Sequence, residues 1–403
     1  TTGDNNVAMG SYAMDANTTG TQNVGIGVHA LGGNTTGAYN VAVGENSLKA
    51  NTTANDNTAI GYNAMTVNTT GAGNTAVGIY ALDANTTGNT NVAVGKFALS
   101  ANTTAADNTA VGTSALAANT TGDQNVSVGS NALDANTTGR NNIGIGKDSL
   151  GVNTTGDANL SIGVAALDAN TTGDKNLGLG YGALSANTTA DNNTAVGYLA
   201  GSVTTTGTGN TFVGANTGNG NVVTDGSNNV AIGFNVEQNA TDAANSIVIG
   251  HNFTGASNDF SFGKASNVVT NDFDTDADWS RSSDVRLKRN IESTTLGLDF
   301  INDLRPIKFQ WKPSNEVPEI MTSEYNKENQ KNLDYVSHGF IAQEVKEAID
   351  KHGDITFGGW HIDKTDNETQ RVKKNMFVMP LIKAVQELST KVEELETKLN
   401  EEK

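Results

Sequence analysis

A short polar stretch, Ser282 to Ile291, combines residue types that could support acyl-transfer chemistry. It reads SSDVRLKRNI, so serine hydroxyls and an aspartate precede three basic side chains. A serine hydroxyl is a weak nucleophile and needs a neighbouring base, but the stretch contains no histidine. A lysine can act as that base when burial lowers its pKa. The same residues would also suit a solvated loop, so the stretch alone leaves both interpretations open.

The stretch coincides with a change in composition. Residues 1–282 contain 7 Lys/Arg and 21 Asp/Glu, whereas residues 283–403 contain 18 and 22. We therefore expect a domain boundary there. The net charge of −18 disfavours nucleic-acid binding, which requires a basic face. No apolar run is long enough to span a membrane, and the absence of cysteine excludes disulfides and thiolate metal sites.

A 17-residue repeat positions everything before the boundary. TTGTQNVGIGVHALGGN begins at Thr18, TTGAYNVAVGENSLKAN begins at Thr35, and the frame continues without insertion into a partial repeat at Thr205. Such invariance indicates a solenoid in which each repeat forms one rung. Rungs about 4.8 Å apart would pair their backbones and bury a shared core, giving a rod roughly 60 Å long for thirteen rungs.

Within a rung, the sixth position is Asn and the tenth is Gly, while the seventh and ninth are branched or long apolar residues around a small eighth residue. This alternation predicts a short strand with one apolar face. Stacking would bury that face, and the asparagines could form side-chain amide ladders. A second apolar position, such as Leu31, closes the rung. We expect NTTG to make the turn, with Asn and Gly in left-handed conformations.

The frame loosens after Gly214. We expect regular β-roll repeats over residues 1–214, diverged rungs over 215–264 and a linker over 265–282. Residues 283–403 form a separate domain of mixed helix and strand. The fold class is therefore mainly β, with a β-solenoid followed by a small α+β domain.

The repeats resemble the left-handed β-roll of trimeric adhesin heads of the YadA-like type, and similar repeats occur in phage tail fibres. The resemblance rests on the NVAVG…AL pattern with Asn-containing turns and covers about residues 1–264. It implies a left-handed roll and three parallel chains in one shaft.

The C-terminal segment 380–403 predicts a coiled coil. Its apolar residues are spaced alternately by four and three, with Lys and Glu on the flanks. The spacing predicts self-association but does not fix the number of helices, for which the roll above it suggests three. The seam residues are Leu381, Val385, Leu388, Val392, Leu395 and Leu399.

Residues 283–403 resemble the peptidase S74 domain, the intramolecular chaperone at the C-terminus of endosialidases and other phage tail proteins. SDVRLKRNI, GFIAQEV and PLIKAVQEL occur in the family's order. The resemblance implies that the domain assembles trimers, assists folding of the preceding fibre and then cleaves itself off. It implies Ser283 as nucleophile and Lys288 as general base.

The predicted cleavage site comprises Ser282, Ser283 and Asp284, with the cut at a bond flanking Ser283. On one straight strand, Ser283 and Lys288 would point to opposite faces. The pair therefore needs a turn or a lysine from a neighbouring chain. We expect Asp284 and Arg286 to shape the site, as well as Gln343 and Glu344, for which helix capping or an inter-chain role is the alternative to catalysis.

No cofactor or metal is expected, because the five histidines form no ligand-spaced cluster. No carboxylate pair is placed as in glycosidases. We predict a homotrimeric virion tail fibre for host attachment, joined to the tail or baseplate through a missing N-terminal region. Its receptor would be a host-surface polysaccharide. The alternative is a bacterial surface adhesin or a contractile-injection-system fibre that retains the same chaperone uncleaved.

Overall fold

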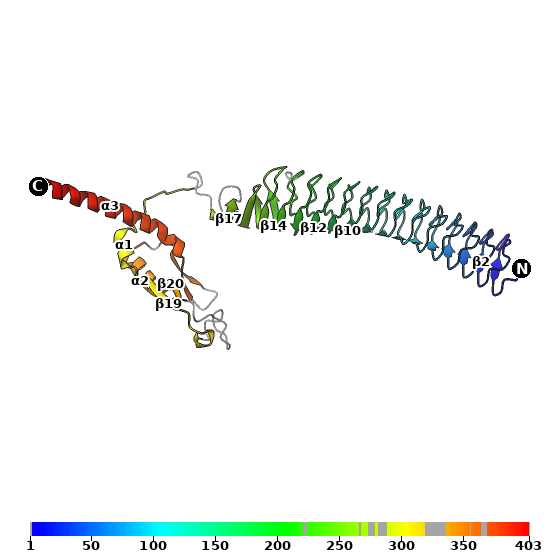
Figure 1. Cartoon of the computed structure of the whole chain (residues 1–403), viewed down its shortest axis with the longest axis horizontal. Helices are drawn as coiled ribbons and strands as arrows, with labels where there is room; N and C mark the ends of the chain where they lie inside the picture. The colour runs from blue at the N-terminus through cyan, green and yellow to red at the C-terminus, as the bar shows by residue number, and fades with distance from the viewer. Residues whose placement is uncertain are drawn as a thin grey trace. The chain divides into compact units, whose positions relative to one another are not determined.

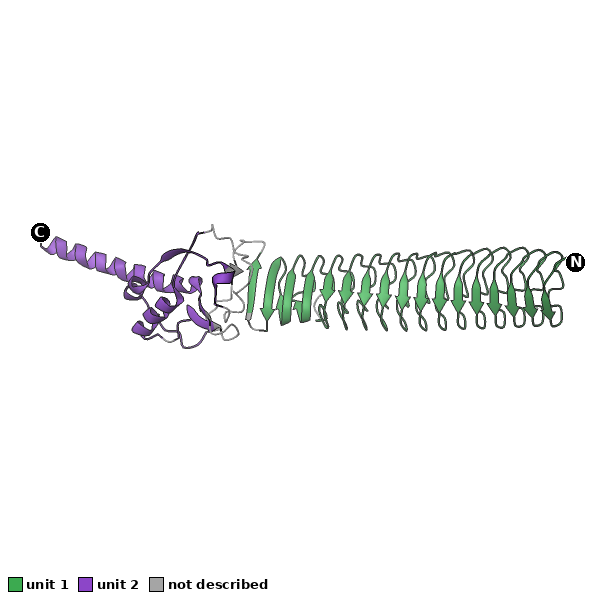
Figure 2. Ribbon diagram, turned by 90° about the horizontal axis from the view of Figure 1, so that it is seen from below, with its two compact units in different colours: residues 1–282 green, residues 283–403 purple. Residues whose placement is uncertain are grey.

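The structure is a computed structural model that describes residues 2–220, 224–265, 267–272, 279–280, 288–318, 336–354, 356–363 and 369–402. The chain forms two compact units, residues 1–282 and residues 283–403 (Figure 2). We call them unit 1 and unit 2. Each is described by itself.

Unit 1 is a β-solenoid with one short strand in each rung (Figure 1). Each of the first twelve strands pairs in parallel with the strand 17 residues further on, as Val24 does with Val41. The strand and rung prediction is thus confirmed, and of the two possibilities for the second apolar position, a short strand or a bend, Leu31 and its equivalents lie in turns. The thirteen regular strands are β1 Val7–Met9, β2 Val24–Ile26, β3 Val41–Val43, β4 Thr58–Ile60, β5 Thr75–Val77, β6 Val92–Val94, β7 Thr109–Val111, β8 Val126–Val128, β9 Ile143–Ile145, β10 Leu160–Ile162, β11 Leu177–Leu179, β12 Thr194–Val196 and β13 Thr211–Val213.

The parallel stack continues through three longer strands, β14 (Val230–Gln238), β15 (Ile247–Gly255) and β16 (Asp259–Lys264). Here the structure corrects one prediction. The segment 265–282, expected to be a linker, contains two antiparallel strands that extend the same sheet. They are β17 (Asn267–Asp272), paired with β16, and β18 (Trp279–Ser280), paired with β17.

We expected the seventh and ninth residues of each strand to face the solenoid interior, but the eighth residue faces it instead. The small residue at the eighth position, such as Ala42 or Ala59, is buried, while the apolar seventh and ninth residues remain half-buried or exposed. The interior is too narrow for anything larger, because a Cβ added to Gly25 would lie 2.9 Å from Met14 Cγ. The core consists instead of stacked Ala and Leu at the thirteenth and fourteenth positions.

Phe212 is the large exception at the eighth position, and two glycines make room for it. The ring is fully buried. Gly201 and Gly218 stand where earlier rungs carry leucine, and a Cβ on Gly218 would lie 2.4 Å from the Phe212 ring. One aromatic ring thus replaces two leucines in the column.

Two columns of buried asparagine hold successive rungs together. At the seventeenth position, each amide donates to the side-chain oxygen of the preceding asparagine, as Asn102 does to Asn85 at 2.9 Å. At the sixth position, the side-chain oxygen accepts the next asparagine's backbone N–H, as Asn91 does from Asn108 at 3.0 Å. The predicted amide ladders are therefore confirmed, and they satisfy polar groups that would be costly to bury unpaired.

We expected left-handed backbone in the NTTG turn, but the Asn and Gly of that turn do not have it. It lies at the fifth, tenth, twelfth and fourteenth positions, for example at Gln22, Gly27, His29 and Leu31. Glycine is required at the tenth position, where Gly27 has φ +134° and an added Cβ would lie 2.5 Å from the carbonyl oxygen of Gly44. The stacking of rungs therefore imposes left-handed φ even on leucine.

Unit 2 is a small α+β unit, as predicted. Phe300 and Phe377 stack in its core with ring centroids 6.2 Å apart. The buried cluster also contains Leu296, Val345, Ala348 and Ile349. Its elements are α1 Leu298–Asp303, β19 Ile307–Gln310, η2 Ser314–Glu316, β20 Val336–Gly339, α2 Ala342–His352, β21 Trp360–Asp363, β22 Thr369–Val372, η3 Lys374–Phe377 and α3 Val378–Glu401.

Candidate cleavage site and the unit that carries it

The boundary stretch is only partly described. Ser282, Ser283, Asp284 and Arg286 lie outside the described residues, so their predicted roles stay predictions. Lys288 is described, and it is exposed on irregular backbone ahead of α1. The described part of the chain therefore does not give the position of the Ser283 hydroxyl relative to the Lys288 amine.

Glu344, predicted to shape the site, has a definite partner. It lies with Gln343 in the first turn of α2, where a negative side chain is favourable. The Arg305 guanidinium donates to both carboxylate oxygens, with Nε 3.0 Å from Oε2. This pairing lowers the pKa of Glu344 and raises that of Arg305. A carboxylate kept ionised in this way is better suited to joining α2 to the segment after α1 than to proton transfer.

A second ion cluster joins the C-terminal ends of α1 and α2. Asp303 Oδ1 accepts from Lys351 Nζ at 2.8 Å, and Asp303 Oδ2 lies 2.6 Å from His352 Nε2. Both partners lower the pKa of Asp303. The sequence could have suggested Lys351 and His352 as favourable charges in a last helical turn, but not their partner.

Glu387 is a structural residue that the sequence analysis missed. It lies on α3, and its Oε2 accepts the backbone N–H of Leu298 at 2.7 Å, at the N-terminus of α1. Gly297 leaves space for it, because a Cβ there would lie 2.4 Å from the same carboxylate oxygen. The contact joins residues 89 positions apart and fixes α3 on α1.

The helix predicted for the C-terminal segment is present as α3, and no residue of the described ranges covers its seam. Pro380 and Ala384 are the buried residues of α3. The seam residues remain exposed, with exposed fractions of 50% for Leu388 and 65% for Leu395. The seam is thus an apolar face that remains exposed in the described part of the chain.

The described residues contain no group of three or more His, Asp or Glu side chains that could hold a metal ion. Among the helices of the described ranges, none is long and apolar enough to cross a lipid bilayer.

The comparisons with known proteins identify one part of the chain. Residues 283–354 match the family model of peptidase S74, described as the chaperone of endosialidase. Neither a curated protein nor a solved structure matches the chain. The matched segment begins where unit 2 begins and includes the boundary stretch, α1 and α2. Unit 2 therefore contains a peptidase S74 domain, the chaperone of endosialidase, preceded in this chain by a β-solenoid.

Proposed function

We propose that this chain is a homotrimeric tail fibre for host attachment, whose C-terminal domain assembles the trimer and is then released by autoproteolysis. The observation that carries the proposal is the peptidase S74 match directly after a long β-solenoid. The family implies self-cleavage and a chaperone role in trimer assembly in general. Surface features in both units support assembly of the chain into a trimer.

The first supporting feature is an apolar stripe along the solenoid, formed by the ninth residues of its rungs together with those seventh residues that are valine, isoleucine or leucine rather than threonine. Its members are on the outer face of the strands, with exposed fractions of 40% for Ile60, 38% for Val111 and 39% for Leu179. Monomeric soluble proteins rarely expose a continuous apolar surface of this kind. We assign the stripe to contacts between the solenoids of parallel chains.

The second supporting feature is the α3 seam. Its alternating four- and three-residue spacing is that of helices packed knobs-into-holes. Three copies of α3 would cover the seam and bring three solenoids into the same register. Register matters because near-identical rungs allow chains to pair one rung out of place. An early clamp at one end removes this ambiguity.

The proposed cleavage uses the Ser283 hydroxyl as nucleophile and Lys288 as the base that accepts its proton. Attack on a backbone carbonyl flanking Ser283 forms an ester and breaks the peptide bond, and water then releases the ester. If Lys288 comes from a neighbouring chain, cleavage waits for assembly. Loss of the clamp then leaves the finished fibre kinetically trapped.

Denaturing mass spectrometry of freshly purified protein tests the catalytic assignment. We expect two fragments meeting at a bond that flanks Ser283 in the native protein and a single full-length species in Ser283→Ala. Lys288→Arg should also stay whole, because arginine remains protonated and cannot act as the base. Ser282→Ala is the matched control and should cleave. Cleavage in Ser283→Ala, or a single 41.8 kDa species in the native protein, would contradict the assignment.

Attachment is tested separately. Fluorescently labelled fibre should bind intact bacterial cells of a susceptible strain and protect them from adsorption of the corresponding phage. Failure to bind any strain in a broad panel would remove the attachment role and leave the chaperone domain in place.

A further inference from the structure

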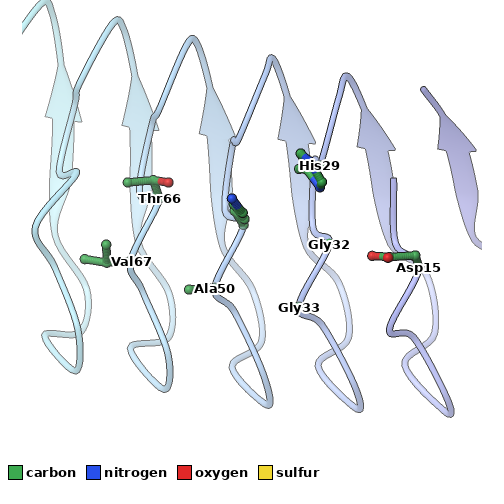
Figure 3. Close-up of a pocket in the computed structure, with 8 residues that line it drawn as sticks. Asp15, His29, Gly32, Gly33, Ala50, Thr66 and Val67 are labelled. Atoms are coloured by element: carbon green, nitrogen blue, oxygen red, sulfur yellow. The ribbon is translucent and has the colours of Figure 1, made fainter. Parts of the chain in front are cut away.

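A hollow of about 480 Å³ lies on the outside of unit 1 between its first four rungs (Figure 3). Its lining includes Asp15, His29, Gly32, Gly33, Lys49 and Thr66. These residues belong to the part of each rung that follows the strand and its glycine turn. None of them contributes to the apolar stripe assigned above to contacts between chains.

The hollow exists because one rung lacks side chains where its neighbours have them. Gly32 and Gly33 occupy the fifteenth and sixteenth positions of the second rung. The sixteenth position carries alanine or valine in the other regular rungs, as at Ala50 and Val67. The floor of the hollow is therefore backbone, with Gly32 buried and Gly33 half-buried, where neighbouring rungs carry side chains such as Lys49 and Ala50.

An aromatic wall lies at one side of the hollow. The His29 imidazole stacks on the Tyr12 ring, with centroids 4.9 Å apart and planes 9° from parallel. The solenoid does not need rings at this twelfth position, because other rungs place Asn46, Asn63 or Ser114 there with the same left-handed backbone. Tyr12 nevertheless has an exposed fraction of 60%. An exposed ring pair that the fold does not require is available for a ligand.

The rest of the rim is polar and carries charges of both signs. Asp15 can accept hydrogen bonds, Lys49 can donate them, and Thr66 can do both. Asp15 and Lys49 are two rungs apart, a separation of roughly 9–10 Å along the solenoid at the usual strand spacing. With one carboxylate and one ammonium group, the rim favours a neutral ligand rich in hydroxyl groups over a single ion.

We propose that this hollow binds an oligosaccharide, with the C–H face of one sugar ring on His29 and the hydroxyl groups of that ring and of its neighbours in the saccharide bonded to Asp15, Lys49 and Thr66. A sugar ring has an apolar face and a rim of donors and acceptors, which match the aromatic wall and the polar rim. The hollow's volume falls within the ordinary range of small-molecule sites. The inference rests on the proposed attachment function and names the class and place of the receptor.

The test uses the full chain on an array of defined bacterial oligosaccharides, followed by titration of the glycans bound. His29→Asn installs the residue that neighbouring rungs carry at this position, and Gly32→Ser fills the floor with a residue used at Ser100. Ser114→Asn, the same kind of change in a distant rung, is the control. We expect an affinity loss of at least about tenfold for both hollow variants and none for the control.

Circular dichroism confirms that each variant keeps its β signal. Native protein that binds no glycan, or hollow variants that bind as tightly as Ser114→Asn, would overturn the saccharide site. Cell binding separates this result from failure of the attachment function. If the native chain and His29→Asn bind cells equally, the hollow is not the receptor site but attachment stands. If the native chain binds no cells, the attachment function itself fails.

Discussion

The two units of this chain are stabilised by contacts of different kinds. In unit 1, each residue touches its counterpart 17 positions away, so the same alanine, leucine and asparagine contacts recur at every rung. Unit 2 depends on unique contacts between distant residues, such as Glu387 with Leu298, and leaves a long apolar helix face exposed. The comparison suggests that the solenoid's stability adds up rung by rung, whereas unit 2 relies on a few single contacts.

Phe212→Ala should give the largest loss of stability, because it removes a large ring from the column of small and aliphatic side chains that forms the core of unit 1. The ring is fully buried, and its glycine neighbours cannot fill the space. We expect unfolding of unit 1 to become easier by about 3–5 kcal/mol, measured by chemical denaturation followed by far-ultraviolet circular dichroism. Ala195→Gly, also at an eighth position, is the control and should cost far less. Equal losses in both variants would show that Phe212 does not pack as described.

Asn102→Ala should give the next largest loss, because it interrupts one amide ladder. The side chain donates to Asn85 and to the carbonyl of Ala105, and accepts from Asn119 at 3.1 Å. Leaving buried groups unpaired costs about 1–3 kcal/mol. Thr104→Ala, on the exposed edge of the next rung, should be close to neutral. The same denaturation experiment compares the two, and a neutral Asn102→Ala would mean that the ladder does not contribute to stability.

Glu387→Ala tests the contrasting kind of contact in unit 2. It removes the acceptor for the Leu298 N–H and should destabilise unit 2 by about 1 kcal/mol, as the loss of a helix cap does. Tryptophan fluorescence in a Trp279→Phe background follows this transition, because the two remaining tryptophans, Trp311 and Trp360, lie in unit 2. Glu393→Ala, on the exposed part of the same helix, should have no such effect. A shift in the circular dichroism transition of unit 1 as well would show that the two units do not unfold separately.

Acidification should affect the two units in opposite directions. Partial burial raises the pKa of Asp83, Asp134 and Asp168 in unit 1. Above their raised pKa values, the ionised aspartates therefore destabilise the folded state. This destabilisation is lost as the pH falls toward the usual aspartate pKa of about 3.9, so acidification should stabilise unit 1.

In unit 2, cationic partners lower the pKa of Asp303 and Glu344. Their stabilising effect is complete above the ordinary carboxyl pKa and is lost as pH falls through the lowered values. Because both groups are exposed, the change should be small. Denaturation monitored by circular dichroism and by tryptophan fluorescence between about pH 6 and pH 3 checks the opposite signs. Asp303→Asn should reduce the loss of stability that unit 2 shows on acidification. A change of stability with the same sign in both units would contradict the predicted opposite effects of pH.

The sequence predicted the rungs of unit 1 but not which side of each strand faces inward. An invariant 17-residue spacing determines which residues stack, so the Asn102 ladder could be expected. Alternation around Ala42 defines two strand faces without saying which is inside. The narrow interior decides that question, since it admits only small residues beside a column of leucine such as Leu48.

In unit 2, the sequence predicted the elements better than their contacts. The spacing of Leu381 to Leu399 marked α3, because helical periodicity is local. The contact of Glu387 with Leu298 and that of Glu344 with Arg305 join segments far apart in sequence. No periodicity encodes such pairs. The Ser283 nucleophile was proposed from family resemblance, and its geometry lies outside the described residues.

The antiparallel strands after β16 have a consequence for the length of the solenoid. A parallel stack exposes unpaired backbone groups at its last strand and could continue to add like strands without limit. β17 runs antiparallel to β16, and β18, a strand of two residues, runs antiparallel to β17. After one reversed strand, an edge strand of only two residues is a poor template for another rung, so β17 and β18 together act as a terminator. Lengthening by duplication would then have to occur among the interior rungs, in whole multiples of 17 residues.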